Sequence, residues 1–293
     1  MACNFWRSSH CLRWILREKK EPFQPIDRNY FKPTEIKWLR LYFVEILHKA
    51  GKYLKFRQKL VATAAVFFKR FYIQQSFVNF DPFLVVPTLL FIAAKTEEWP
   101  CRPEKILAAV EKYLKADCPS LEYGYGVPDL IQCEFYAIEV LEFDLIVFHP
   151  YRSLLIILAE TKIVPDAMDD RNFPLQDEEA RKFFDLCWSI VNDSLRTDLS
   201  LFHPPYLIAA TAVYIAAHFL NKMPLIRVML ENLAQKLSQV IDITNEILSL
   251  YEFYDKGSSV DMGALLLKLF NKIRDPQVHA FVNAQIFSHS KSS

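Results

Sequence analysis

Residues 81–95 read DPFLVVPTLLFIAAK, and residues 204–218 read PPYLIAATAVYIAAH. Aligned without gaps, the two stretches share Pro, Leu, Thr, Ile and Ala-Ala, and Phe in the first is twice replaced by Tyr in the second. Their apolar runs are shorter than the ~20 residues that a membrane-spanning helix needs, so each is expected to be a buried helix of a globular core. The sequence therefore predicts a duplicated, all-helical unit.

Helical spacing of apolar residues continues on both sides of each stretch. In the first repeat it predicts helices at 34–50, 56–75, 81–98, 103–115 and 128–142, with Gly51 marking the end of the first. In the second repeat, at about 150–255, it predicts helices near 177–199, 204–220, 224–236 and 240–255. The segment 162–176 is expected to be a surface loop between the first two helices of this second repeat, the later of which is the helix near 177–199.

Two further helices are predicted outside the repeats, a short amphipathic one at 4–18 and another at 260–274, followed by a tail expected to be disordered. The predicted domains are an N-terminal helix with its connector, the two repeats, and a C-terminal helix with its tail, at 1–33, 34–148, 149–255 and 256–293.

Composition excludes several classes of function. Five glycines in 293 residues form no dinucleotide-binding fingerprint or phosphate loop, and six cysteines without a CxxC pair favour neither a zinc site nor a disulfide framework. A net charge of +1 provides no field that would attract nucleic acid or an anionic membrane. Catalytic motifs are also missing. We therefore expect no enzyme, no cofactor or metal, and no direct contact with nucleic acid or membrane.

Several strings carry a resemblance to a known family, and the resemblance covers roughly residues 1–255. They are NFWRSSH at 4–10, KFRQKLVATAAVFFKRFY at 55–72, QCEFY at 132–136, LIVFHPYR at 145–152, IVNDSLRTDL at 190–199 and HPPYLIAA at 203–210. Together they resemble the cyclin family, and within it the C type that associates with Mediator. The loop near 162–178 is longer than usual for that family, residues 100–104 diverge, and nothing after about 255 is recognisable.

The resemblance implies two tandem five-helix cyclin boxes with an extra N-terminal helix. It also implies a non-catalytic regulatory subunit that binds and activates a cyclin-dependent kinase of the Mediator complex in the nucleus, and so regulates transcription by RNA polymerase II. Other subunits of the Mediator kinase module are implied as further partners. A kinase needs its C helix in the active position, and a rigid partner surface can bias that two-state element.

The resemblance assigns kinase contacts to Lys95, at the end of the third helix, and to Glu134 within QCEFY, and it implies that the two lie close together. Lys95 aligns with His218, so only the first box is expected to bind the kinase. Glu97 and Glu98 either contact a partner or form a solvated helix end. Trp6, in the N-terminal helix, is expected to contact the kinase, or alternatively to fold back onto the first box.

In the second repeat, Trp188, Asn192 and Asp193 fall near one face of a predicted helix, with Tyr251 expected nearby. A groove facing other Mediator subunits and ordinary helix packing are two interpretations of this set. For the whole chain, the alternatives are a cyclin H-like protein of another transcriptional kinase complex and a DNA-binding initiation factor with cyclin folds. The neutral charge and the absence of CxxC argue against the initiation factor.

Overall fold

The computed structural model describes residues 4–16, 23–161, 178–256 and 261–274, and these contain helices and turns but no strand. The prediction of an all-helical protein is confirmed. The predicted loop at 162–176 and the tail beyond 274 lie outside the described residues. The chain divides into two compact units, one formed by 20–146 with 259–293 and the other by 1–19 with 147–258.

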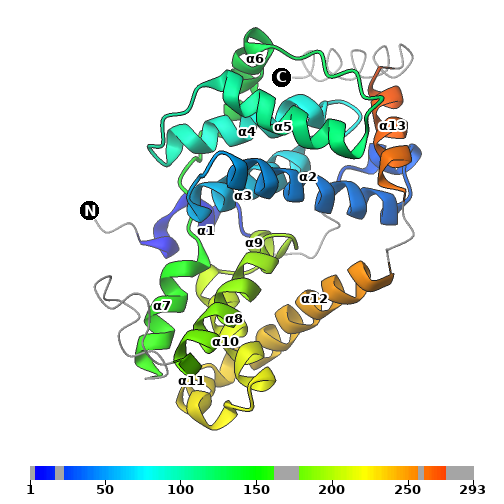
Figure 1. Ribbon diagram of the computed structural model, residues 1–293. Helices are drawn as coiled ribbons and strands as arrows, with labels where there is room; N and C mark the ends of the chain where they lie inside the picture. Colours follow the sequence, from blue (N-terminus) through cyan, green and yellow to red (C-terminus); the bar gives the residue numbers. More distant parts are fainter. Residues whose placement is uncertain (1–3, 17–22, 162–177, 257–260, 275–293) are drawn as a thin grey trace, which may run out of the picture. The chain divides into compact units, whose positions relative to one another are not determined.

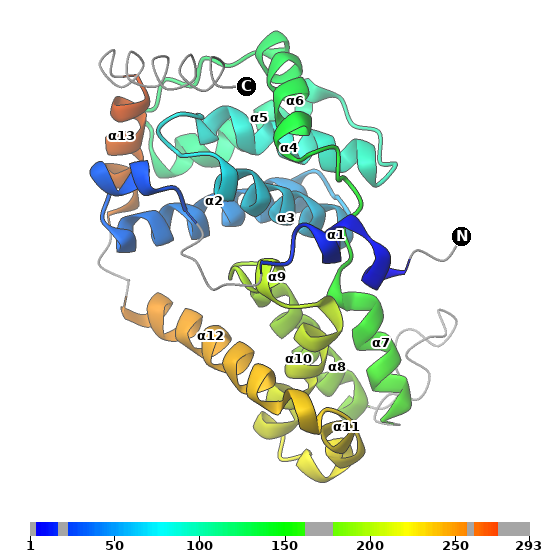
Figure 2. The same ribbon diagram turned by 180° about the vertical axis from the view of Figure 1, so that it is seen from behind.

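The first unit contains the first repeat (Figures 1 and 2). Its helices are α2 (Pro33–Tyr53), α3 (Gln58–Gln74), α4 (Pro82–Thr96), α5 (Pro103–Asp117), α6 (Val127–Val140) and α13 (Met262–Ile273), preceded by the 3-10 helix η2 (Pro25–Asn29). The five predicted helices of the repeat are present, with ends shifted by a few residues. Helix α3 packs on α4 and α2, α4 packs on α6, and α2 packs on α5.

Helix α3 is the centre of this unit. Every side chain from Leu60 to Tyr72 is buried, and the run includes Lys69 and Arg70. Full burial of a large apolar side chain stabilises the fold by roughly 1.5–3 kcal/mol, so the phenylalanines of FFKRFY contribute much of the core. None of the described helices is both long and apolar enough to cross a membrane.

Gly51 does not end its helix as the sequence predicted, because α2 continues to Tyr53 and the chain turns at Lys55, whose φ is 57°. A Cβ atom at Gly51 would lie 2.4 Å from Cγ2 of Val61 on α3. The glycine is therefore required for the close approach of α2 and α3, and it tolerates the helical conformation at a modest cost.

The second unit contains the second repeat. Its helices are α7 (Pro150–Glu160), α8 (Glu178–Ser194), α9 (Leu199–Phe202), α10 (Pro205–Phe219), η4 (Met223–Ile226), α11 (Arg227–Asn232), η5 (Ala234–Lys236) and α12 (Leu237–Lys256). Helix α10, the repeat of α4, packs on α7, α8 and α12 (Figure 1). Both apolar stretches identified in the sequence are therefore the central helices that the duplication predicted.

Two predicted helices of this repeat are wrong in extent. The helix at 177–199 ends at Ser194, where the hydroxyls of Ser194 and Thr197 donate to the carbonyl oxygens of Val191 and Ser194 and compete with helical hydrogen bonding. The helix at 224–236 is three short pieces. Only Ile226 is buried among these residues, so no continuous apolar face supports a longer helix.

The predicted helix at 4–18 is also shorter. It consists of a 3-10 turn, η1 (Phe5–Arg7), capped by Asn4, and a single turn, α1 (Ser9–Leu12), capped by Ser8. This segment belongs to the second unit, where the Leu16 amide donates to the Leu201 carbonyl at 2.7 Å and the Phe148 amide to His10 Nδ1 at 3.0 Å. The segment thus packs on the second repeat, and Trp6 contacts Tyr206 of α10 there.

Candidate functional site

Lys95 and Glu134 form an ion pair between the last turn of α4 and the middle of α6. The Lys95 ammonium donates to Oε1 and Oε2 of Glu134 at 2.7 and 2.9 Å and lies 4.3 Å from the centroid of the Phe91 ring. The Lys95 side chain is 54% exposed and that of Glu134 only 9%. An ammonium has three donors, so the exposed cation keeps one N–H that it can donate to a partner.

Large apolar side chains are exposed along α6 and in the segment that follows it. Phe135 is the neighbour of Glu134, Phe143 is 73% exposed, and Ile146 is 60% exposed. We call Lys95, Glu134, Phe135, Phe143 and Ile146 the α4–α6 surface. An exposed charge and several exposed apolar side chains on neighbouring elements are typical of a protein-binding site, because such apolar side chains gain by being removed from water.

The turn after α6 presents Phe143 in a conformation that is unfavourable for the isolated chain. Glu142 and Phe143 both have positive φ, 53° and 59°, which is rare for residues other than Gly, Asn and Asp. The fully buried Arg70 holds this turn, because its Nη1 donates to the Asp144 carbonyl at 3.0 Å. Burial lowers the pKa of Arg70 to about 9, so the side chain is still charged at neutral pH.

Sequence reasoning missed Phe135, Phe143 and Ile146. A signal was present, because an amphipathic helix at 128–142 places Phe135 on the face opposite to the buried Leu130, Ala137 and Leu141. An aromatic residue on the polar face of an amphipathic helix is a mismatch that indicates a contact outside the unit.

The two acidic residues after Lys95 have different surroundings. Glu97 accepts from the Thr63 hydroxyl at 2.9 Å and pairs with Lys59 at 2.6 Å, so it ties the end of α4 to α3. Glu98 is exposed and has a φ of 53° at the turn that ends the helix. Glu97 thus contributes to the unit itself, and Glu98 presents its carboxylate to solvent.

Trp6 lies on the second unit and is 55% exposed. Its ring is T-shaped to Phe5, with centroids 5.1 Å apart, and is 5.9 Å from the ring of Tyr206 on α10. The Lys236 ammonium also lies over the Trp6 ring, 6.0 Å from its centroid, and the exposed part of the indole remains available to a partner.

The four residues predicted as a groove of the second repeat contact two different helices. Trp188 packs on Tyr151 of α7 with ring centroids 4.7 Å apart, and Asn192 accepts from the Tyr151 hydroxyl at 2.9 Å. Asp193 accepts from the Tyr251 hydroxyl of α12 at 2.9 Å. The set therefore joins α8 to α7 and α12, and each of its members keeps part of its side chain exposed.

The family described as Cyclin, N-terminal domain matches residues 13–146. Cyclin-C of Rattus norvegicus is 34% identical over 281 residues, which cover 94% of this chain and 93% of the rat protein. Cyclin-C of Drosophila melanogaster is 32% identical over 286 residues, which cover 94% of this chain and 99% of the fly protein.

Solved structures share the fold at lower identity. A chain of the CAK complex from Chaetomium thermophilum has a TM-score of 0.68 and 19% identity, over 99% of this chain and 96% of that one. A chain of the yeast TFIIK complex has a TM-score of 0.62 and 21% identity, over 83% of this chain and 100% of that one. The identity to the two C-type cyclins extends over nearly the whole length. The chain belongs to the cyclin family and, within it, to the C type.

Proposed function

We propose that this protein is a non-catalytic regulatory subunit that binds a cyclin-dependent kinase through the α4–α6 surface and activates it. The observation that carries this proposal is the Lys95–Glu134 pair, in which a nearly buried carboxylate of α6 fixes a half-exposed ammonium at the end of α4, while Phe135 of α6 and Phe143 after it are exposed. Charged groups held in place by their own unit lose little conformational freedom on binding, and this favours a specific contact.

The chemistry is performed by the kinase. Its active state requires a lysine of the nucleotide site to pair with a glutamate of the C helix, and a partner shifts the kinase to that state only if it binds that state more tightly. The α4–α6 surface can supply this difference, because apolar side chains such as Phe143 and Ile146 can cover one face of a kinase helix while Lys95 donates to a backbone carbonyl at its end.

The kinase of the Mediator complex is the partner that the relationship to C-type cyclins favours, with other Mediator kinase-module subunits as further partners and the nucleus as the location. A cyclin H-like role in another transcriptional kinase complex is the second candidate, since two of the structural matches are chains of the CAK and TFIIK complexes. The identity of 32–34% to Cyclin-C over 94% of the chain supports the first candidate.

Affinity purification of the tagged full chain from nuclear extract tests the proposal, followed by identification of the co-purifying kinase and assay of its activity. We expect a Mediator-type kinase that is active with this subunit and inactive without it. The Phe143→Asp chain is the matched negative bait. Recovery of a kinase of the CAK type instead would support the cyclin H-like role, and recovery of no kinase would contradict both.

A further inference from the structure

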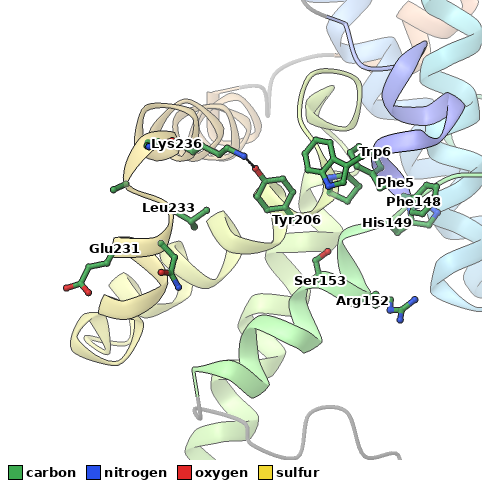
Figure 3. A pocket seen from close by; sticks show the side chains of 14 residues that line it. Phe5, Trp6, Phe148, His149, Arg152, Ser153, Tyr206, Glu231, Leu233 and Lys236 are labelled. Carbon is green, nitrogen blue, oxygen red and sulfur yellow. Dashed lines mark hydrogen bonds between the residues drawn. The ribbon is translucent and has the colours of Figure 1, made fainter. Parts of the chain in front are cut away.

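A groove in the second unit is not explained by kinase binding. It encloses about 850 Å³ between α7, α10 and residues 231–236, and the segment at Phe5 and Trp6 closes one end of it (Figure 3). Its apolar wall is formed by aromatic rings, among them Phe148 and Tyr206. Asn232 and Gln235 add side-chain amides, which can hydrogen-bond to an extended backbone.

The groove continues along α10 into a second hollow of about 440 Å³, because both are bounded by Tyr206, Asn232 and Leu233. The walls of this second hollow are largely aliphatic, with Glu160 and Thr161 at one edge, and they include Leu225 and Val228, which are among the most exposed apolar side chains of the unit. The two hollows together suit an extended segment with one side chain in each, rather than a single compact ligand.

The charges at the first hollow are unbalanced. Arg152 is exposed, and among the described residues it has no hydrogen-bond or ion-pair partner. The ammonium of Lys236 donates to the hydroxyl of Tyr206 and lies 4.9 Å from its ring centroid (Figure 3). The one acidic residue at the rim, Glu231, is paired with Arg227 at 2.9 Å. The first hollow is therefore cationic.

The start of α7 adds to this cationic character. This eleven-residue helix begins at Pro150, has no acidic residue in its first turn, and receives no side-chain hydrogen bond at its N-cap. The partial positive charge of a helix N-terminus favours a carboxylate, and Arg152 and Ser153 of the same turn line the groove (Figure 3). Two independent features, the side-chain cations and the helix end, thus select the same ligand charge.

From these contacts we infer that the groove binds an extended segment of a partner protein in which an acidic side chain stands close to a large apolar one. The carboxylate would pair with Arg152 at the start of α7, its apolar neighbour would pack on Tyr206, and a second apolar side chain would enter the hollow at Val228. This site is separate from the α4–α6 surface and goes beyond the proposed kinase binding.

The test is selection of a displayed library of random peptides of about twelve residues on the immobilised full chain, followed by direct binding of the most enriched peptide. We expect enrichment of Asp or Glu within a few positions of Phe, Trp or Leu. Charge reversal, Arg152→Glu, should weaken that peptide at least about tenfold, and Val228→Asp should weaken it several-fold. The matched control is Arg181→Glu, which reverses an exposed cation of α8 that is not in the groove.

Three outcomes would overturn the inference: selection of basic peptides, equal affinity of the enriched peptide for wild type and Arg152→Glu, and enrichment no greater than on the Arg152→Glu chain. Both groove variants change exposed side chains, so melting curves should match wild type. Kinase co-purification should be unchanged in Arg152→Glu. Failure of the wild-type protein to co-purify a kinase would contradict the proposed function but not the binding of a segment in this groove.

Discussion

The ends of α4 and α10 show what the duplication kept and what it changed. Both helices are central, buried and of the same length, and they end in Ala-Ala followed by Lys95 in one case and His218 in the other. Lys95 is paired with a nearly buried glutamate of α6, whereas His218 is followed by Phe219, which is 60% exposed. The apolar scaffold thus does not require the ion pair, and we attribute the pair to binding.

The two repeats should differ most in how their exposed phenylalanines affect kinase affinity. Replacing Phe143 by Asp should lower kinase affinity by at least about 30-fold, or about 2 kcal/mol, because aromatic anchors dominate interfaces and a carboxylate would remain desolvated. The matched variant Phe219→Asp at the end of α10 should bind normally. Titration calorimetry with the purified kinase measures both. Equal losses in the two variants would remove the distinction between the repeats.

Charge reversal at the two helix ends is the second test. Lys95→Glu should weaken kinase binding about tenfold, since it loses a charge-assisted hydrogen bond and places two carboxylates together. His218→Glu is the control and should have no effect on affinity. The Lys95→Glu melting temperature should fall modestly, because the nearly buried Glu134 loses its cation and gains a like charge beside it, so affinity is measured well below that transition.

Glu134 needs a milder substitution, because its side chain is nearly buried and a reversed charge there would destabilise α6. Glu134→Gln keeps the shape and should reduce affinity less than Lys95→Glu. Reversing both residues should not restore binding if Lys95 contacts the kinase. Full recovery of affinity in the double reversal would show that the pair acts only within the unit.

The N-termini of α4 and α10 are expected to contribute differently to the pH dependence of folding stability. Asp81 caps α4 by accepting from the Phe83 amide at 2.8 Å, whereas α10 has Pro204 at this place and no side-chain cap. Burial raises the pKa of Asp81 from 3.8 to about 6, against the effect of its hydrogen bonds from Tyr125 and Phe83. The folded state therefore holds this proton more tightly than the unfolded chain, and its stabilising effect is lost as pH rises from about 4 to about 6.

Asp81→Asn keeps a capping side chain and removes the titration. We expect the free energy of unfolding to fall less between pH 4 and pH 6.5 than in wild type, by about 1–2 kcal/mol. Urea unfolding at several pH values measures this difference. Asp261→Asn, at the exposed N-cap of α13, controls for the exchange of capping residue. An unchanged pH profile in Asp81→Asn would show that this carboxyl titrates normally.

The sequence predicted the architecture well because burial repeats with a helical period, and the duplicated stretch identified both central helices. It predicted poorly where exposed segments decide the structure. The breaks within 223–236 and the early end of α1 arise where few side chains are buried, so apolar spacing carries little information. The approach of Lys95 to Glu134 followed from the family resemblance, whereas exposure of Phe143 depends on the turn that Arg70 holds, a contact between residues far apart in the chain.

Trp6 gives the smallest expected effect and tests whether the second unit also takes part in kinase binding. Trp6→Ala should lower affinity for the Mediator-type kinase by about fivefold, because part of the ring already contacts Tyr206 and only its exposed part can contact a partner. The loss should be smaller for a cell-cycle kinase, which is expected to recognise mainly the first repeat. Binding of wild type and variant to both kinases measures this, with melting curves as the folding control. Equal losses for the two kinases would contradict a role in specificity, and a collapsed melting transition would assign Trp6 to the core of the second unit.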